Sequence, residues 1–274
     1  MRVITSAKDL ELPLGQRVGF VPTMGALHEG HLALIRKAKD VTGFCVVSIF
    51  VNPTQFGPNE DFSRYPRTFA DDVAKAEQAG ADVIYAPEVT EIYGEDRVWV
   101  RVEGVSSRWE GEWRPGHFEG VATVVAKLFM LVRPSDVFFG MKDLQQCAVI
   151  QALIRGLMFP IEMHIEPTVR DADGLALSSR NRFLSDVDRA TASALPKSLR
   201  QGLLSISNGA PVPKVLADCE GALVESGFEV QYVAYVDPDS MEPLTEKHES
   251  GRMIVAAKLG TTRLIDNLGH FDTF

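Results

Sequence analysis

Two spacings of apolar residues alternate along the first two thirds of this chain. Short, continuous apolar runs have the length and β-branched character of buried strands, and they are Val18–Val21, Phe44–Val51, Ala81–Tyr85, Asp136–Phe139 and Ile161–Ile165. Between them lie stretches with helical spacing, namely Leu32–Lys39, Thr68–Gln78, Phe118–Val132 and Leu144–Met158. The pattern therefore predicts strands and helices in strict alternation.

Such alternation favours right-handed crossover connections and a parallel sheet. We predict an α/β fold with a Rossmann-like parallel sheet and helices on both faces. After about Arg170 the pattern changes to two helical runs, Val187–Ser207 and Val212–Glu225, followed by two strands, Phe228–Val236 and Arg252–Leu259. We therefore predict two domains, a Rossmann-like domain over residues 1–168 and a smaller α+β domain over residues 169–274.

Composition narrows the class of protein. With 274 residues, 45% apolar and 24% charged, the chain has average globular composition, and its net charge of -9 argues against a nucleic-acid binder. The three cysteines lie far apart, which disfavours a disulfide framework or a zinc site. The first residues lack the apolar core of a signal peptide, and no apolar run reaches the roughly 18 residues of a membrane span. We expect a cytoplasmic protein without a membrane or nucleic-acid partner.

The sequence PTMGALHEGH, residues 22–31, joins the first predicted strand to the first helix. In a parallel sheet, ligands bind beyond the carboxyl ends of the strands, where this segment lies. Its two histidines are compatible with metal binding, with phosphate binding at a helix N-terminus, or with a simple turn. No third ligand is evident nearby, which disfavours a metal, but the spacing HxGH does not by itself decide between phosphate and turn.

Three further polar clusters are candidates for chemistry. Asn52 and Gln55 follow the second strand and offer amides for a substrate with hydroxyl groups, although Asn-Pro is also a common turn. Lys142 and Asp143 begin a helix after another strand and suit phosphate and Mg²⁺, although an acidic residue is also ordinary at a helix start. The segment Arg170–Asn181 is either a phosphate-binding loop or a polar connection between domains.

Taken together in this order, PTMGALHEGH, FVNPTQF, RPGHFEGVATVV, FFGMKDLQQ, DGLALSSRN and TRLIDN make the chain resemble the pantothenate synthetase (pantoate–β-alanine ligase) family of HxGH nucleotidyltransferases. The resemblance extends over essentially the whole chain. It implies the ATP-dependent ligation of (R)-pantoate and β-alanine to pantothenate through a pantoyl adenylate, with release of AMP and pyrophosphate. It also implies small-molecule substrates only, Mg²⁺ as the cofactor of ATP, and a homodimer.

The resemblance further implies roles for individual residues. Catalytic roles fall to His28, His31 and Lys142, with His31 as the proton donor. Asp143 would help to place Mg²⁺, and Asn52 would support a pocket in which Gln55 and Gln146 hold pantoate and Gln55 also adjoins β-alanine. Glu110 and Arg114 would form a gate. The expected ATP-binding residues are Met24, Gly25, Ala26, Leu27, His28, Glu29, Gly30, His31, Gly140, Met141, Lys142, Asp143, Val169, Leu177, Ser178, Ser179 and Arg180.

Domain 1–168 would thus bind the nucleotide and pantoate, and domain 169–274 would close over them. One residue departs from the family pattern, because Met141 stands where Glu or Gln usually precedes the lysine. A thioether is a weak acceptor, so we expect altered nucleotide affinity rather than another reaction. The rival interpretations are an HxGH adenylyltransferase acting on a phosphate ester such as phosphopantetheine, and a nucleotide-sensing protein without catalysis.

Overall fold

The structure, a computed structural model, describes residues 1–58 and 60–272, and the chain divides into two compact units. Unit 1 comprises Met1–Met141 and Val149–Pro167, and unit 2 comprises Lys142–Ala148 and Thr168–Phe274. The division into domains 1–168 and 169–274 remains a prediction. The contacts group Lys142–Ala148, which the sequence places in the first domain, with unit 2.

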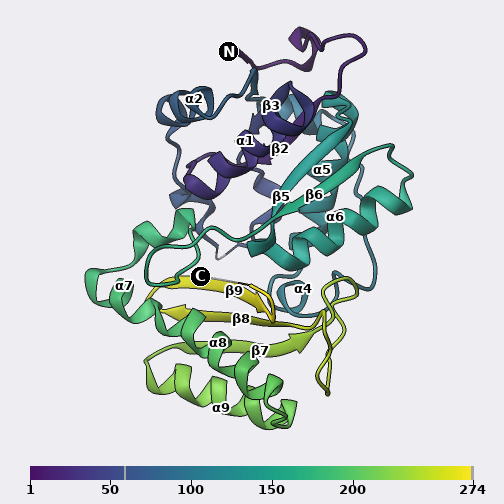
Figure 1. Cartoon of the computed structure of the whole chain (residues 1–274). Helices are drawn as coiled ribbons and strands as arrows, with labels where there is room; N and C mark the ends of the chain where they lie inside the picture. Colours follow the sequence, from purple (N-terminus) through teal and green to yellow (C-terminus); the bar gives the residue numbers. More distant parts are fainter. Residues whose placement is uncertain (59, 273–274) are drawn as a thin grey trace. The chain divides into compact units, whose positions relative to one another are not determined.

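A parallel sheet forms the centre of unit 1 (Figure 1), as predicted. In spatial order its strands within the described residues are β1 (Arg2–Ile4), β4 (Val83–Tyr85), β3 (Cys45–Ile49), β2 (Gly19–Thr23), β5 (Asp136–Gly140) and β6 (Glu162–Glu166). The helices of this part of the chain are α1 (Glu29–Thr42), α2 (Phe69–Gln78), α3 (Val89–Tyr93), α4 (Glu110–Trp113), α5 (His117–Val132) and α6 (Leu144–Gly156).

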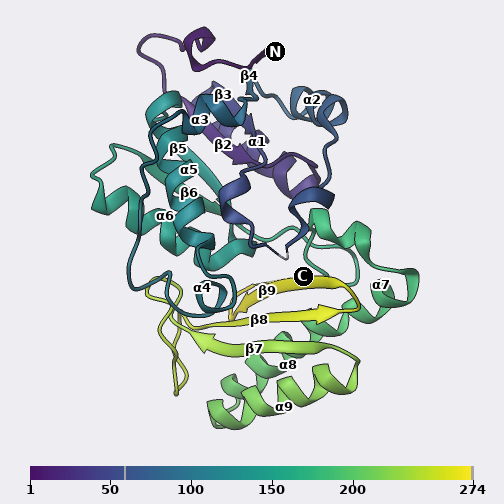
Figure 2. The ribbon, with the colours of Figure 1, turned by 180° about the vertical axis from the view of Figure 1, so that it is seen from behind.

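Helices lie on both faces of this sheet because its strands are apolar on both sides. Successive strand residues point to opposite faces. Val21 packs with Ile35 of α1, whereas the ring of its neighbour Phe20 meets Phe129 of α5 edge-on, with 6.4 Å between the ring centroids. Helices α1 and α5 therefore cover opposite faces of the sheet (Figures 1 and 2).

The carboxyl ends of β2 and β3 meet at one edge of the sheet. The two strands pair in register from Gly19 opposite Cys45 to Thr23 opposite Ile49. Beyond the last pair, the amide of Phe50 donates to the carbonyl of Thr23 at 3.0 Å, and Thr23 Oγ1 donates to the carbonyl of Ser48 at 2.7 Å. The segments that follow these two strands, which carry the two histidines and Asn52–Gln55, therefore begin side by side.

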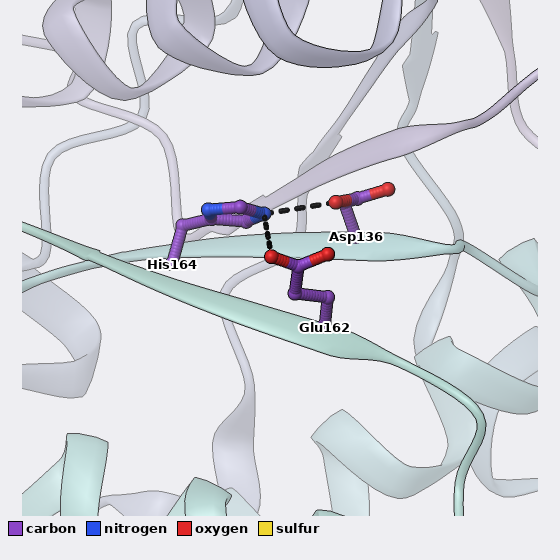
Figure 3. Close-up of side chains that lie close together, drawn as sticks. All are labelled: Asp136, Glu162 and His164. Atoms are coloured by element: carbon purple, nitrogen blue, oxygen red, sulfur yellow. Dashed lines mark hydrogen bonds and ion pairs between the residues drawn. The ribbon is translucent and has the colours of Figure 1, made fainter.

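An ion-pair network joins the amino ends of β5 and β6, at the opposite edge. Asp136, Glu162 and His164 lie together there (Figure 3), with His164 Nε2 donating to Asp136 Oδ1 at 2.8 Å. Their spacing is short enough for a metal ion, but the guanidinium of Arg17 already hydrogen-bonds both oxygens of Asp136. Burial tends to raise the pKa of Asp136, yet hydrogen bonds from Arg17, Ser135 and His164 lower it. We interpret the network as structural.

Unit 2 combines an antiparallel sheet with helices, which confirms the expected α+β character. Its strands, in spatial order, are β7 (Glu229–Val236), β8 (Arg252–Leu259) and β9 (Thr262–Gly269). Its helices are α7 (Asp186–Ala192), α8 (Ala194–Ser207) and α9 (Val212–Glu225). Helices α8 and α9 pack on one face of this sheet (Figure 2), around a core that includes Leu199, Leu223 and Val255.

Two predictions for this unit were wrong in detail. The single helix expected over Val187–Ser207 is interrupted at Ser193, which ends α7 and caps α8. Pro196, which lacks an amide hydrogen, lies in the first turn of α8, where such a hydrogen has no partner within the helix. Strand β9 was not predicted at all, because its buried Asp266 and Asn267 interrupt the apolar pattern of a strand.

Candidate active site

The segment between β2 and α1 places two histidine side chains at the start of a helix. His28 is the N-cap of α1, and the ring centroids of His28 and His31 lie 4.1 Å apart. The backbone amide of His28 donates to Nδ1 of His31 at 3.3 Å. A neutral imidazole that accepts at Nδ1 carries its proton on Nε2. The fold therefore makes Nε2 the donor of neutral His31.

Gly30 provides the space for this arrangement. A Cβ atom at residue 30 would lie 3.0 Å from both Cε1 and Nδ1 of His28, tighter than an ordinary contact between side-chain atoms. Any larger residue would push on the ring of His28. The glycine between the two histidines is thus explained by packing, since its backbone is helical and does not have the positive φ that favours glycine.

Asn52 and Gln55 lie in the turn after β3, and both are buried. The amide nitrogen of Asn52 donates to Gln55 Oε1 at 3.0 Å and to the carbonyl of Gly120 at 3.2 Å. Its Oδ1 accepts hydrogen bonds from Tyr93 Oη at 2.6 Å and from Thr54 Oγ1 at 2.9 Å. The side chain of Asn52 thus hydrogen-bonds within the protein through both its nitrogen and its oxygen. One of these bonds goes to Gln55 Oε1, so Asn52 orients the side-chain amide of Gln55.

The backbone of Gln55 is held from helix α5. Nδ1 of His117 donates to the carbonyl of Gln55 at 2.8 Å, and Nε2 of the same ring accepts from Arg114 at 3.1 Å. Burial, followed by the nearby charge of Arg114, lowers the pKa of His117 to about 4. The ring is thus neutral near neutral pH, with its proton on the nitrogen that faces Gln55.

Two carboxylates hold the guanidinium of Arg114. Its Nε and Nη2 each donate to one oxygen of Glu60 at 2.7 Å, and Nη1 lies 3.6 Å from Glu110 Oε2. Burial opposes the charged form of Glu60, but the hydrogen bonds and the charge of Arg114, together with a backbone hydrogen bond from Gly57, lower the pKa of this carboxyl. Glu110 and Arg114, expected to form a gate, are therefore brought together as an ion pair between a buried carboxylate and a half-buried guanidinium.

Sequence reasoning did not identify Glu60, Tyr93 or His117 as site residues. His117 belongs to the motif RPGHFEGVATVV, which contributed to the family resemblance without a role for its histidine. That motif was the one available signal. The contacts of Tyr93 and Glu60 join segments that are 41 and 54 residues apart, and a pattern along the chain does not reveal them.

In unit 2, the backbone of Lys142 is tied to the last strand. The side-chain amide of Asn267 in β9 donates to the carbonyl of Lys142 at 3.0 Å, while Nε of Arg252 donates to Asn267 Oδ1 at 2.9 Å. Lys142 Nζ lies 3.5 Å from Asp143 Oδ1, and Gln146 follows half-buried in α6. These contacts explain why Lys142–Ala148 group with unit 2.

The segment Val169–Arg180 is also fixed within unit 2. The amide of Leu177 donates to the carbonyl of Val169 at 2.9 Å. Arg170 forms a buried bidentate ion pair with Asp266, at 2.7 and 2.9 Å. Ser178 accepts from the amide of Arg180 at 3.3 Å and so caps the short helix Ser179–Phe183. The expected residues Val169 and Leu177–Arg180 thus belong to one braced segment.

Comparison with known proteins agrees with these motifs. The family model described as Pantoate-beta-alanine ligase matches residues 2–269. The chain belongs to this family. It is 50% identical over 256 residues to a pantothenate synthetase from Sphingopyxis alaskensis, an alignment that covers 93% of this chain and 92% of that protein.

Solved structures agree as well. A pantothenate synthetase from Thermus thermophilus superposes with a TM-score of 0.95 at 46% identity, covering 99% of this chain and 100% of that one. A pantoate-beta-alanine ligase from Francisella tularensis, complexed with beta-gamma ATP and beta-alanine, gives a TM-score of 0.84 at 32% identity, with 100% and 99% coverage.

Membership of the family confirms four predictions made from the sequence. These are the resemblance itself, the fold class, the assignment as a ligase, and the function, which is the ATP-dependent ligation of pantoate and β-alanine through pantoyl adenylate. Along the part of the chain that the structure describes, no helix is long and apolar enough to cross a membrane. The roles of individual residues remain proposals.

Proposed function

We propose that Met24–His31 binds ATP in this ligation and that His31 donates a hydrogen bond from Nε2 to the phosphates. The observation that carries the proposal is the hydrogen bond from the amide of His28 to Nδ1 of His31, which fixes the proton of the neutral ring on Nε2. The N-terminus of α1, with the partial positive charge of the helix dipole, favours the same anionic ligand. His28, whose ring lies against that of His31, would contact the phosphates as well.

The two steps of the ligation explain why hydrogen-bond donors, without a nucleophilic side chain, suffice for catalysis. A carboxylate oxygen of pantoate attacks the α-phosphorus of ATP and displaces pyrophosphate. The amine of β-alanine then attacks the acyl carbon, and AMP leaves with the bonding electrons. No step requires a nucleophilic side chain, so catalysis depends on positioning the substrates and on stabilising charge that develops on phosphate oxygens. His31 supplies a donor for that charge.

We assign to Gln55 the binding of pantoate and a place beside the β-alanine site. Its Oε1 already accepts from Asn52, so its Nε2 is the atom that is oriented to donate to a carboxylate or hydroxyl oxygen of the substrate. Gln146 is proposed to hold pantoate on the strength of the family resemblance. Asn52 supports the pocket by orienting Gln55, and Glu110 and Arg114 support it through the contacts of Arg114 with the carbonyl of Gln55 and with His117.

The proposed phosphate-binding residues of unit 2 are Lys142 and the segment Ser178–Arg180. Val169 and Leu177 of the same unit, and Gly140 and Met141 of unit 1, are proposed to contribute to ATP binding as well. The donor set also fits Mg²⁺, because this ion prefers one or two carboxylates together with substrate phosphates, and the carboxylate of Asp143 is about half exposed. Asp143 would hold the ion, which would neutralise phosphate charge. A cytoplasmic homodimer is proposed from the resemblance, and sedimentation analysis of the purified protein tests the dimer.

A substrate-omission assay followed by ³¹P NMR tests the proposed function. We expect sustained formation of AMP and pyrophosphate with ATP, pantoate and β-alanine together, and its loss when either acid is withheld. Formation of a dinucleotide from ATP and a phosphate ester would instead support the rival adenylyltransferase. Binding of ATP and pantoate without any AMP would support the nucleotide sensor.

A further inference from the structure

Two side chains of helix α2, which lies about 45 residues further along the chain, hydrogen-bond the backbone of the proposed ATP-binding segment. Oδ2 of Asp72 accepts the amide hydrogen of Ala26 at 3.0 Å, and Oδ1 accepts that of Leu27 at 2.7 Å. One turn further along α2, Nζ of Lys75 donates to the carbonyl of Leu27 at 3.0 Å. The two side chains of one helix therefore bind the donors and the acceptor of a single short stretch of backbone.

This stretch requires an external support. Gly25 and Ala26 both have left-handed backbone angles, with φ of 80° and 51°, and only glycine adopts such angles without steric cost. Both residues are buried, so their amides need partners from the protein. The amide of Gly25 donates to Thr23 Oγ1 at 3.1 Å, and Asp72 takes the next two amides.

The environment of Asp72 also indicates a dedicated contact. Its exposed fraction is 1%, and a third donor, Oγ1 of Thr68, reaches its Oδ2 at 3.1 Å. An acidic residue in the first turn of a helix ordinarily stays at the surface and stabilises the helix dipole. Here the buried carboxylate is satisfied by backbone amides of another segment. Lys75, in contrast, is partly exposed and also pairs with Asp71 at 2.7 Å.

We propose that Asp72 and Lys75 are positioning residues that fix residues 24–28 and thereby hold His28 and His31 against the phosphates of ATP. The proposal rests on the proposed nucleotide role of this segment. Neither residue needs to touch the substrate. We call the contacts of Asp72 and Lys75 with the backbone of residues 26 and 27 the clamp. Loss of the clamp should weaken ATP binding, while pantoate binding, which we assign to the Gln55 turn, stays unchanged.

The variant Asp72→Asn tests this clamp, because asparagine keeps the size of the side chain but turns an NH₂ group toward a backbone amide. Glu77→Gln, which removes an exposed carboxylate from the same helix, is the matched control. In hydrogen exchange of the substrate-free protein, amides 26 and 27 of Asp72→Asn should exchange at least about 10-fold faster than in the control. The KM for ATP should rise about 10-fold, with the KM for pantoate within about 2-fold of wild type.

Unchanged exchange at residues 26 and 27 would overturn the proposal, as would an equal rise of both KM values. A rise in the Mg²⁺ concentration needed for half-maximal activity, with unchanged exchange, would make Asp72 a metal-binding group and would also overturn it. The exchange measurement needs no substrate, so absence of ligase activity would refute the proposed function without affecting this result.

Lys75→Met keeps the proposal testable if Asp72→Asn does not fold. The side chain of Lys75 is 37% exposed, so the fold should tolerate its loss. We expect faster exchange at the same two amides and a rise in the KM for ATP of about 3-fold. Exchange and KM values equal to those of the wild type would contradict the clamp.

Discussion

Protonation of His117 should destabilise unit 1 at mildly acidic pH. The pKa of this ring is lowered from its ordinary value of 6.5 to about 4 in the folded protein, chiefly by burial and then by Arg114. As the pH falls, the unfolded chain therefore binds a proton before the folded protein does. The free energy of unfolding is fully retained above about pH 6.5 and decreases through the window down to about pH 4.

The structure sets the size of this effect. Each unit of pKa difference corresponds to about 1.4 kcal/mol, so His117 should cost the folded protein about 3 kcal/mol near pH 4. Proton uptake would also place a second positive charge beside Arg114, whose Nη1 lies 3.1 Å from the ring. The Nδ1–H bond to Gln55 does not require the charged ring, so it offers little compensation.

Urea unfolding followed by tryptophan fluorescence measures this loss. All three tryptophans, Trp99, Trp109 and Trp113, belong to unit 1, so their signal reports on the unit that contains His117. The reference is His117→Asn, whose amide can still donate to the carbonyl of Gln55 but does not titrate. Between about pH 7 and pH 4, the wild type should lose about 3 kcal/mol more than this variant.

Groups shared by both proteins, including Glu60, contribute to each curve, and the difference between the curves isolates His117. Parallel stability curves for the two proteins would show that protonation of His117 does not destabilise unit 1. They would mean that the ring is already charged in the folded state, or that the protein relaxes around the proton without cost. A larger loss for His117→Asn would reverse the predicted sign.

Three further outcomes are expected. His31→Ala should slow pantoyl adenylate formation by about 100-fold or more in rapid-quench experiments, as expected for loss of one electrostatic or acid–base group, and near-normal rates would remove His31 from the chemistry. Gln55→Ala should weaken pantoate binding about 10-fold in calorimetry while ATP binding stays within about 2-fold, so unaltered pantoate affinity would contradict its role. Met141→Glu should change ATP affinity relative to Met141→Leu, and identical affinities would show that this departure from the family pattern is without consequence.

The parallel sheet could be predicted because its strands are covered on both faces and read as continuous apolar runs. Val46 and Val47, for example, are both fully buried although they point to opposite faces. Strand β9 could not be predicted in the same way. The charge of its buried Asp266 is compensated by an ion pair with Arg170, 96 residues away, and the local sequence pattern does not reveal this partner.

The candidate site shows the same division. The histidines of HxGH and the amides of Asn52 and Gln55 were identified because they follow strand ends directly. Their supports were missed, because Asp72 resembles any acidic residue in a first helical turn. What distinguishes Asp72 is that it accepts hydrogen bonds from the amides of Ala26 and Leu27, and these contacts depend on packing between α2 and the segment after β2.

Transfer of ¹⁸O from pantoate to AMP would show that the reaction passes through pantoyl adenylate. Pantoate labelled in both carboxylate oxygens is incubated with the protein, ATP, Mg²⁺ and β-alanine, and the AMP is examined by ³¹P NMR. We expect AMP that carries one ¹⁸O on phosphorus, because the carboxylate oxygen that attacks the α-phosphorus leaves with AMP. Unlabelled AMP, or ADP as the nucleotide product, would contradict ligation through pantoyl adenylate.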